Sequence, residues 1–231
     1  MALPRNQSPV YEMMLPLLGK KVKYRGFCVK EQKALLMAVQ GNTSEIILAV
    51  NEAVHACLFE AVDVDTLANY DLEYAFMQIR MRSAGETIDL ELTCHKCDTK
   101  NDYTLNLGDV KPDVKKSNNK IQLSDNLGVI MRYPTTAEMG YLDDKPTTET
   151  VFKTIMNCIE TVYTQDEIFE TKNESEKERR EFIESLSPEQ LSLIEQFFAS
   201  IPILKHEFKN TCGSCSYEST YVMEGIESFF G

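Results

Sequence analysis

Two cysteine pairs place the strongest constraint on how this chain can fold. Cys94-His-Lys-Cys97 and Cys212-Gly-Ser-Cys215 share the CxxC spacing, and each follows a threonine. On both sides of each pair, apolar and polar residues alternate, which is typical of strands. Each pair is therefore predicted to form the turn at the tip of a β-hairpin. Two such tips facing each other would present four thiolates to one tetrahedral Zn²⁺, at about 2.3 Å from the metal.

The sequence therefore predicts one structural zinc ion, whose ligands are Cys94, Cys97, Cys212 and Cys215. Four thiolates close the coordination sphere, so no activated water remains and the metal would not be catalytic. Two alternatives stay open: an iron–sulfur cluster, and thiols that hold no metal or take part in redox chemistry. A redox CxxC pair usually opens a helix after a strand, whereas strands are expected on both sides of each pair here.

The separation between the pairs is unusual. The intervening segment, 98–211, has 114 residues, whereas about 15–20 residues are usual in zinc ribbons. The long spacing weakens the pattern, but a shared metal would then tie residue 94 to the last strands of the chain. The predicted fold class is α+β, with helical blocks around a split zinc-ribbon-like β element formed by the two CxxC hairpins.

We interpret the chain as a single α+β domain, 1–231, with five segments. They are a basic N-terminal hairpin (1–28), a first helical block (29–85), strands with the first CxxC pair (86–134), a second helical block (135–202) and strands with the second CxxC pair (203–231).

Three local predictions concern the second helical block. Val151, Ile155, Cys158 and Val162 recur at helical spacing and are expected on one buried helical face. Residues 167–180 are expected to form a loop and then an exposed helix. Ser187-Pro-Glu-Gln190 has the sequence of a helix start with a capping box.

Catalytic motifs are missing from the sequence. It has no phosphate-binding loop, GxGxxG, GxSxG or HExxH, and only three histidines. The remaining cysteines, Cys28, Cys57 and Cys158, lie singly in apolar stretches and are expected in the core. His95 could replace a thiolate in the first turn, but four cysteines suffice. We therefore expect no enzyme; a metalloenzyme with an open three-ligand site is the remaining enzymatic alternative.

Charge is unevenly distributed along the chain. With 24 basic and 36 acidic residues the net charge is −12, which argues against general binding of nucleic acid. Residues 1–35 nevertheless hold seven basic and two acidic side chains, whereas 166–195 hold four basic and ten acidic ones. Such segregation indicates either solvated faces or complementary patches for a partner or a second copy. The residues assigned to a partner-binding surface are Lys20, Lys21, Lys23, Arg25, Lys30 and Lys33.

Membrane insertion is not expected. No apolar run approaches the length of about 18 residues that a membrane span needs. The first residues also lack an apolar stretch of the secretory type, so the protein is expected to stay in a cytoplasm.

The stretch from Leu15 to Ala38 reads LPLLGKKVKYRGFCVKEQKALLMA. It resembles the N-terminal signature of the baseplate hub assembly proteins of T-even-type contractile-tailed bacteriophages. In that family an LP…GKK segment, a short basic strand with an arginine, an aromatic residue and a VKEEK-like turn precede the first helix. Gly26 stands where proline is expected, and Gln32 where glutamate is commoner. The cysteine pairs are not part of this resemblance, so the zinc prediction depends on their spacing alone.

The resemblance implies a non-enzymatic viral structural or assembly protein that acts in forming the central hub of the tail baseplate. Its partners would be other baseplate hub proteins or a second copy of itself. It would act in the host cytoplasm, and the sequence does not decide whether it stays in the virion tail. The alternative is an intracellular zinc-ribbon adaptor or regulator that binds nucleic acid or a polymerase. A basic surface at the hairpin tips would favour it, but only His95, Lys96 and Lys100 supply such charge.

Overall fold

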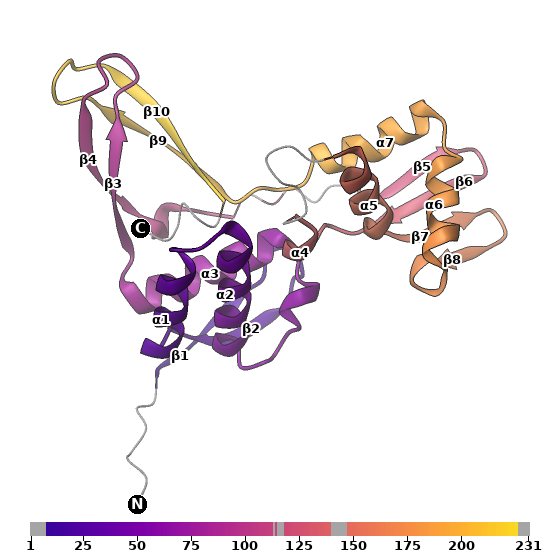
Figure 1. Cartoon of the computed structure of the whole chain (residues 1–231), viewed down its shortest axis with the longest axis horizontal. Coiled ribbons are helices and arrows are strands. Elements are labelled where there is room, and N and C mark those ends of the chain that lie inside the picture. Colours follow the sequence, from indigo (N-terminus) through magenta and orange to yellow (C-terminus); the bar gives the residue numbers. More distant parts are fainter. Residues whose placement is uncertain (1–7, 113, 115–117, 140–146, 226–231) are drawn as a thin grey trace, which may run out of the picture. The chain divides into compact units, whose positions relative to one another are not determined.

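The structure is a computed structural model that describes residues 8–112, 114, 118–139 and 147–225. The chain forms two compact units, and Figure 1 labels their elements. Unit 1 comprises 1–114 and 203–231, and unit 2 comprises 115–202. Unit 2 is thus inserted in sequence between the two CxxC pairs. The fold is mixed α and β with several small sheets, as the fold class predicts. The description as one domain of five segments stays a prediction.

Unit 1 begins with the predicted hairpin. Strands β1 (Val10–Met14) and β2 (Lys21–Arg25) pair antiparallel, and Gly19 in the turn has a positive φ, 65°. Helices α1 (Val29–Ala38), α2 (Thr43–Cys57) and α3 (Asn69–Ala84) follow, with a short 3-10 helix η1 (Val64–Thr66) before α3. The hairpin and the three helices share one apolar core, which includes Leu15, Val50 and Phe76.

Cys28 is not in that core, so its predicted burial is wrong. It is exposed and forms the N-cap of α1. The reason is positional, because the N-cap lies where the chain leaves β2 and turns into the helix. The Cys28 sulfur there contacts Arg25 Nη1, at 3.4 Å. Cys57 and Cys158 are buried, as predicted.

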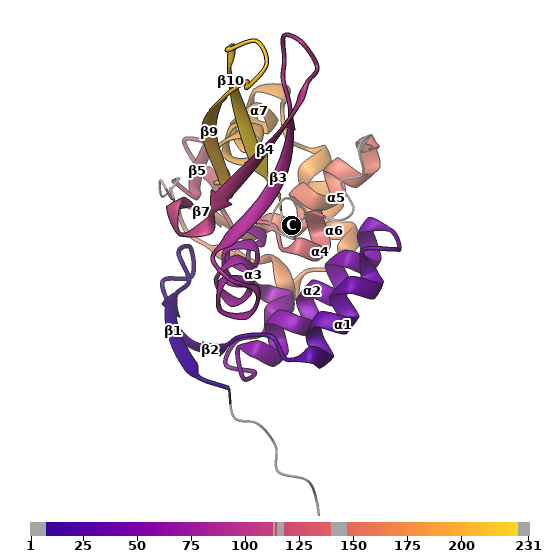
Figure 2. The same cartoon turned by 90° about the vertical axis from the view of Figure 1, so that its left-hand side faces the viewer.

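The two CxxC hairpins complete unit 1. Strand β3 (Thr87–Thr93) pairs antiparallel with β4 (Lys100–Asn106), and β9 (Lys205–Thr211) pairs with β10 (Glu218–Glu224). A 3-10 helix, η2 (Leu107–Asp109), follows β4. Figures 1 and 2 show the two hairpins side by side with their tips at the same end. Their inward residues and α3 form a second core that includes Met77, Leu105 and Phe208.

Unit 2 contains an antiparallel sheet of strand order β5-β6-β7-β8. The strands are β5 (Lys120–Ser124), β6 (Leu127–Met131), β7 (Ile159–Thr164) and β8 (Ile168–Glu170). The helices are α4 (Thr136–Met139), α5 (Thr148–Cys158), η3 (Thr171–Asn173), α6 (Glu176–Glu184) and α7 (Pro188–Ala199). Its core includes Val129, Met131, Ile155 and Ile194.

Two predictions for this region are wrong in part. Residues 168–170 form strand β8 where a loop is expected, because they pair with β7, although the exposed helix α6 does follow. Helix α5 ends at Cys158, and Val162 belongs to strand β7 instead of the helical face that also contains Val151 and Ile155. Residues 159–164 are rich in β-branched and aromatic side chains, and β7 pairs with β6 on one side and β8 on the other. Sheet pairing therefore outweighs helical periodicity here. The start of α7 is confirmed, with Ser187 as N-cap and a capping box to Gln190.

Candidate metal centre

The four cysteine sulfurs of the two hairpin tips lie together. All four are within 4.8 Å of one another. Cys94 Sγ lies 3.7 Å from Cys215 Sγ, and Cys97 Sγ lies 3.7 Å from Cys212 Sγ. A tetrahedral ion with metal–sulfur bonds of about 2.3 Å needs sulfurs about 3.8 Å apart. Each of these two 3.7 Å distances joins a sulfur of one hairpin to a sulfur of the other. The arrangement therefore suits a single metal ion shared by the two hairpins.

Both tips have the same backbone structure. The Cys94 N–H donates to Thr99 O at 3.0 Å, and the Cys212 N–H donates to Tyr217 O at 2.9 Å. The residue after each pair, Asp98 or Ser216, has a φ of 56°. Such left-handed conformations are unfavourable for residues other than glycine and persist where the surrounding structure enforces them. Since His-Lys and Gly-Ser differ in chemistry, the common geometry comes from the cysteine spacing and the turn hydrogen bonds.

The environment of the sulfurs favours thiolate at some positions and opposes it at another. Hydrogen bonds from the backbone N–H groups of Cys215 and Ser214 lower the pKa of the Cys212 thiol to about 6. At Cys215 the backbone N–H of Tyr217 also lowers the pKa, but the sulfurs of Cys97, Cys94 and Cys212 raise it to about 12. Four thiolates this close repel one another, so a cation at their centre is needed to keep all four ionised.

Asn101 on β4 joins the first hairpin to the second. Its Nδ2 lies 3.7 Å from Cys212 Sγ, and its Oδ1 accepts a hydrogen bond from the Gly213 N–H at 3.0 Å. The same Nδ2 donates to Thr99 O at 2.9 Å. Asn101 is not among the candidate residues that the sequence indicates. The alternation along β4 is the sequence feature that could have identified it. Asn101 is two residues before Tyr103 and four before Leu105, so all three lie on the inward face of the strand.

Aromatic rings pack between the hairpins. Tyr103 stacks on Phe208 with ring centroids 4.6 Å apart, and Tyr221 follows at 5.9 Å from Phe208. His206 is half-buried and stacks on Phe208. His95 is exposed and packs on Tyr221 at 4.9 Å. Within the described part of the chain, the group of close metal-ligating side chains contains the four cysteines and neither histidine.

The basic residues assigned to a partner surface have different environments. Arg25 Nη2 lies 2.9 Å from Glu31 Oε1, and only 17% and 7% of these side chains are exposed. Lys21 forms an exposed ion pair with Glu12, and Lys20 Nζ donates to the carbonyl of Ala61. Lys23 is exposed on β2, and Lys30 and Lys33 are exposed on α1.

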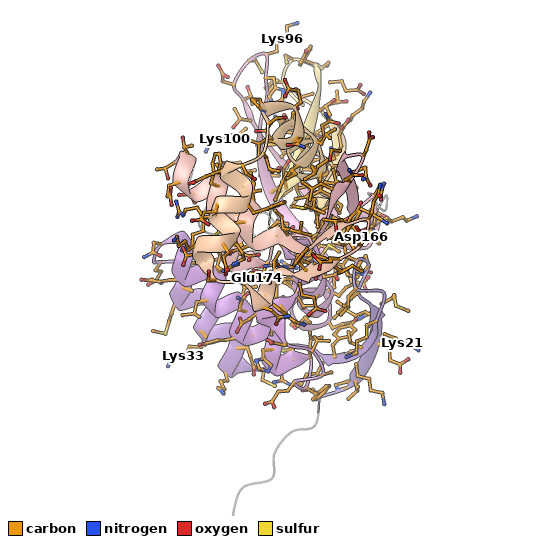
Figure 3. All side chains as sticks on the ribbon, turned by 90° about the vertical axis from the view of Figure 1, so that its right-hand side faces the viewer. Lys21, Lys33, Lys96, Lys100, Asp166 and Glu174 are labelled. Atoms are coloured by element: carbon orange, nitrogen blue, oxygen red, sulfur yellow. The ribbon has the colours of Figure 1, made fainter. Side chains whose placement is uncertain are left out.

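Helix α1 is apolar on two sides. Leu35 and Ala38 pack inward, yet Val29, Leu36 and Met37 are 81%, 62% and 63% exposed. Figure 3 labels Lys33, which lies on this outward side of α1. A helix with apolar residues on both faces is normally covered on both. We call Val29, Lys30, Lys33, Leu36 and Met37 the outer face of α1.

The buried cysteines outside the cluster are poor nucleophiles. Burial raises the pKa of the Cys57 thiol to about 12, and burial likewise raises that of Cys158 to about 12. A thiol with so high a pKa stays protonated near neutral pH. Among the described residues, no helix is both long and apolar enough to cross a membrane.

Comparison with known protein families identifies a family to which the chain is similar. The family model described as T4 bacteriophage base plate protein matches residues 8–231. No curated protein and no solved structure matches the chain.

Proposed function

The chain belongs to the family described as T4 bacteriophage base plate protein, and from that premise we propose that it acts in assembly of the central hub of the tail baseplate. Family membership makes it a structural protein of a T4-type phage baseplate, a virion tail component whose partners are other baseplate proteins. The hub assignment is supported by the resemblance of residues 15–38 to hub assembly proteins. Its action would begin in the host cytoplasm.

The observation that carries the hub proposal is the outer face of α1. Its exposed apolar residues are accompanied by Lys30 and Lys33, so the complementary partner surface is apolar with acidic residues around it. Lys20, Lys21 and Lys23 would add to its positive charge. Arg25 is assigned to the junction between β2 and α1 instead, because its guanidinium is already paired with Glu31.

Charge reversal tests this surface. The double variant Lys30→Glu/Lys33→Glu should associate more slowly with baseplate proteins and with less dependence on salt, while its circular dichroism stays unchanged. The matched control, Lys172→Glu/Lys177→Glu, makes the same charge change at exposed positions of unit 2. Hub assembly in infected cells is the readout. Normal assembly with the α1 variant would contradict the proposal.

We also propose that the four-cysteine cluster holds one structural Zn²⁺. Four thiolates are soft ligands suited to zinc, and the 3.7 Å sulfur pairs match a single tetrahedral ion. An iron–sulfur cluster would place several atoms between the ligand sulfurs and so separate them further. When bound, zinc would supply a closed crosslink between the β3–β4 and β9–β10 hairpins. Asn101 would hold the second turn in register with the first.

Elemental analysis of protein purified without added metal tests the zinc proposal. We expect about one zinc per chain, and its loss in Cys94→Ser/Cys212→Ser. Cys28→Ser is the matched control and should keep the metal, because Cys28 lies outside the cluster. Asn101→Ala should keep the stoichiometry but weaken affinity about 10–100-fold. Protein that contains iron and sulfide, or no metal, would contradict the proposal.

The adaptor alternative has less support. Figure 3 labels Lys96 and Lys100, the two lysines of the first hairpin's tip region. Lys100 pairs with Glu91, and Lys96 Nζ lies over the Tyr217 ring at 5.7 Å from its centroid. Little positive charge at the tips is therefore available for phosphate groups. Failure of the purified protein to shift duplex DNA or RNA at low salt would discard the nucleic-acid-binding form of this alternative, and failure to bind a purified polymerase would discard the other form.

A further inference from the structure

Unit 2 contains an apolar cavity between its sheet and α6. The cavity has a volume of about 280 Å³. Its walls include Leu127 of β6, Val162 of β7, Phe169 of β8 and Phe182 of α6. Val162 pairs with Phe169, so both side chains lie on the same face of the sheet. This volume is at the small end of the range for ligand pockets, which suits a large side chain better than an extended organic ligand.

One wall of the cavity carries an unused hydrogen-bond donor. Arg179 Nε is buried and has no hydrogen-bond partner among the described residues. Its Nη1 reaches Asn157 Oδ1 at 3.4 Å. Glu178 also lines the cavity, but its carboxylate accepts hydrogen bonds from the Ser175 N–H and hydroxyl at the start of α6. Because a buried donor without a partner is unfavourable, rotation of the Arg179 side chain that brings Nε to an acceptor in the cavity would be stabilised.

The cavity adjoins a free sheet edge. Strand β8 is the last in the order β5-β6-β7-β8, so within the described residues its outer backbone edge pairs with no strand. Ile168 is 76% exposed and Phe169 is 39% exposed. Free edges of this kind accept an additional extended segment through main-chain hydrogen bonds, and pockets beside them select side chains.

The rim is acidic. Glu174 lines the cavity, and residues 166–195 hold ten acidic and four basic side chains. Figure 3 labels Asp166 and Glu174 on this unit. Asp166 and Glu167 lie in the turn before β8, and neither they nor Glu174 form an ion pair with a described residue. The charge therefore favours a basic occupant.

We propose that the cavity and the edge of β8 form a docking site for an extended segment of a partner protein, in which basic residues flank one large apolar side chain. The apolar side chain fills the cavity, and a backbone carbonyl of the segment accepts from Arg179 Nε. The basic residues face Glu174 and the turn before β8. This site is separate from the four cysteines and from the outer face of α1, so it goes beyond the proposed function.

The absence of tryptophan from the chain allows a direct test. Phe169→Trp introduces a single tryptophan at the cavity. The probe is the capped heptapeptide Thr-Lys-Val-Phe-Val-Lys-Thr, in which both Lys lie on the same face of an extended segment as Phe, compared with versions in which Phe becomes Ala or both Lys become Glu. We expect a saturable shift in tryptophan emission with the Phe peptide. Binding should be at least about tenfold weaker for the Ala and the Glu peptides, because each lacks one of the two required features.

A second measurement keeps the test valid if Phe169→Trp perturbs the fold. Fluorescence anisotropy of the labelled Phe peptide with the wild-type protein should give the same order of the three affinities. Arg179→Ala should weaken binding at least about fivefold. Lys177→Ala, on the exposed side of the same helix, is the matched control and should leave affinity unchanged.

Three results would overturn the proposal. One is the lack of saturable binding by any of the three peptides in both measurements. Another is equal affinity for the Phe, Ala and Glu peptides, which would indicate nonspecific contact. The third is a tryptophan emission shift that depends on protein concentration without peptide, which would identify a second copy of the chain as the occupant.

Discussion

The two units use the same residues where a hairpin passes into a helix. In unit 1, Arg25 at the end of β2 pairs with Glu31 in α1, at 2.9 Å. In unit 2, Arg132 directly after β6 pairs with Glu138 in α4, at 2.6 Å. In both cases six positions separate the arginine from the glutamate. Each arginine also donates from Nη1 to the carbonyl of the following residue.

The glutamates in turn cap the helices. Glu31 accepts a hydrogen bond from the Cys28 N–H at 2.8 Å, and Glu138 accepts one from the Thr135 N–H at 2.9 Å. Burial alone would raise the pKa of each carboxyl. The arginine and the backbone N–H groups outweigh burial, so the pKa of each lies below its usual value.

Beyond this junction the units differ in how they complete their β structure. Unit 2 adds β7 and β8 to its β5–β6 hairpin, so four strands share one ladder of hydrogen bonds. Unit 1 keeps each of its three hairpins as a separate two-stranded sheet. Two-stranded hairpins are at best marginally stable alone. The β3–β4 and β9–β10 hairpins therefore depend on the core that they share with α3, on aromatic stacking and on the four cysteines. Unit 2 also contains stacked aromatic rings, but its strands are joined by one continuous ladder and it contains none of the four cysteines.

Removal of the proposed zinc ion should have the largest effect on the difference between the two units. Closing a loop of more than 100 residues constrains the unfolded chain by about 4–5 kcal/mol in the crosslink model. This is a large share of a typical stability of about 5–15 kcal/mol. We expect chelation to leave most helical circular dichroism but to expose the region from Ile203 onward to protease before the helices melt. Unit 2 should keep its protease resistance.

Cys94→Ser/Cys212→Ser should reproduce the effect of chelation, and Cys28→Ser should not. Complete unfolding in one step would mean that the metal nucleates the whole fold. Unchanged protease resistance of β9 and β10 would mean that the two pairs share no metal.

Loss of the arginine–glutamate ion pair between strand and helix should reduce stability by a smaller amount, which is similar in the two units. Glu31→Gln and Glu138→Gln each leave a partly buried arginine without its carboxylate, at a cost of about 1–3 kcal/mol. Glu31→Gln should cost more, because Arg25 and Glu31 are more buried than Arg132 and Glu138. Urea denaturation checks this, with an unchanged m-value as the sign that only stability changed. If only one of the two variants lost stability, the two arginine–glutamate pairs would not have equivalent roles.

The parts of the fold that sequence predicts are local. The spacing within each CxxC pair and the alternation around it indicate hairpin tips, and the structure has both. The Ser187-Pro-Glu-Gln190 start of α7 and the turn at Gly19 likewise depend on a few adjacent residues. For the same reason the four sulfurs could be selected from seven cysteines. Their closeness in space, however, depends on hairpins separated by 114 residues in sequence.

Features that depend on distant partners are not predictable in this way. Val162 fits a helical period and also a strand, and its pairing with β6 and β8 decides the outcome. The charge pattern identifies Arg25 as basic but not that Glu31 neutralises it. The sequence does contain a signal for these ion pairs. In both Arg25/Glu31 and Arg132/Glu138, a glutamate follows an arginine by six residues where a strand ends. Asn101 gains its role only because the second hairpin lies opposite.

A pH change should distinguish the units more weakly. Burial raises the pKa of Glu73 on α3 to about 7, against a hydrogen bond from Asn69 that lowers it, while the charge of Glu224 adds to the increase. The unfolded chain ionises this group near pH 4.3. Between these two pKa values, folding is accompanied by binding of a proton at Glu73. The free energy of unfolding of unit 1 should therefore increase by about 1 kcal/mol as pH falls from 8 to 6. Lowered pKa values at Glu31 and Glu138 act only at lower pH, and in both units.

Hydrogen exchange of α3, corrected for the intrinsic effect of pH, measures this difference. Helix α7 of unit 2 is the internal reference. Glu73→Gln is the matched control and should remove the pH dependence of α3 in this range. A wild-type α3 whose protection does not increase between pH 8 and 6 would contradict the prediction.

Exposed ion pairs should distinguish the units least. Lys100 pairs with Glu91 across β3 and β4, Lys209 pairs with Glu218 across β9 and β10, and Arg180 pairs with Glu149 in unit 2. All these side chains are well solvated, so the attraction is screened and is offset by the entropy of fixing long side chains. Lys100→Ala, Lys209→Ala and Arg180→Ala should each shift the melting temperature by less than about 2 °C. If Lys209→Ala instead destabilised the protein as much as Glu31→Gln does, surface charge would be holding the second CxxC hairpin. The contrast between a unit that we propose to be held by zinc and a unit held by its four-stranded sheet would then no longer stand.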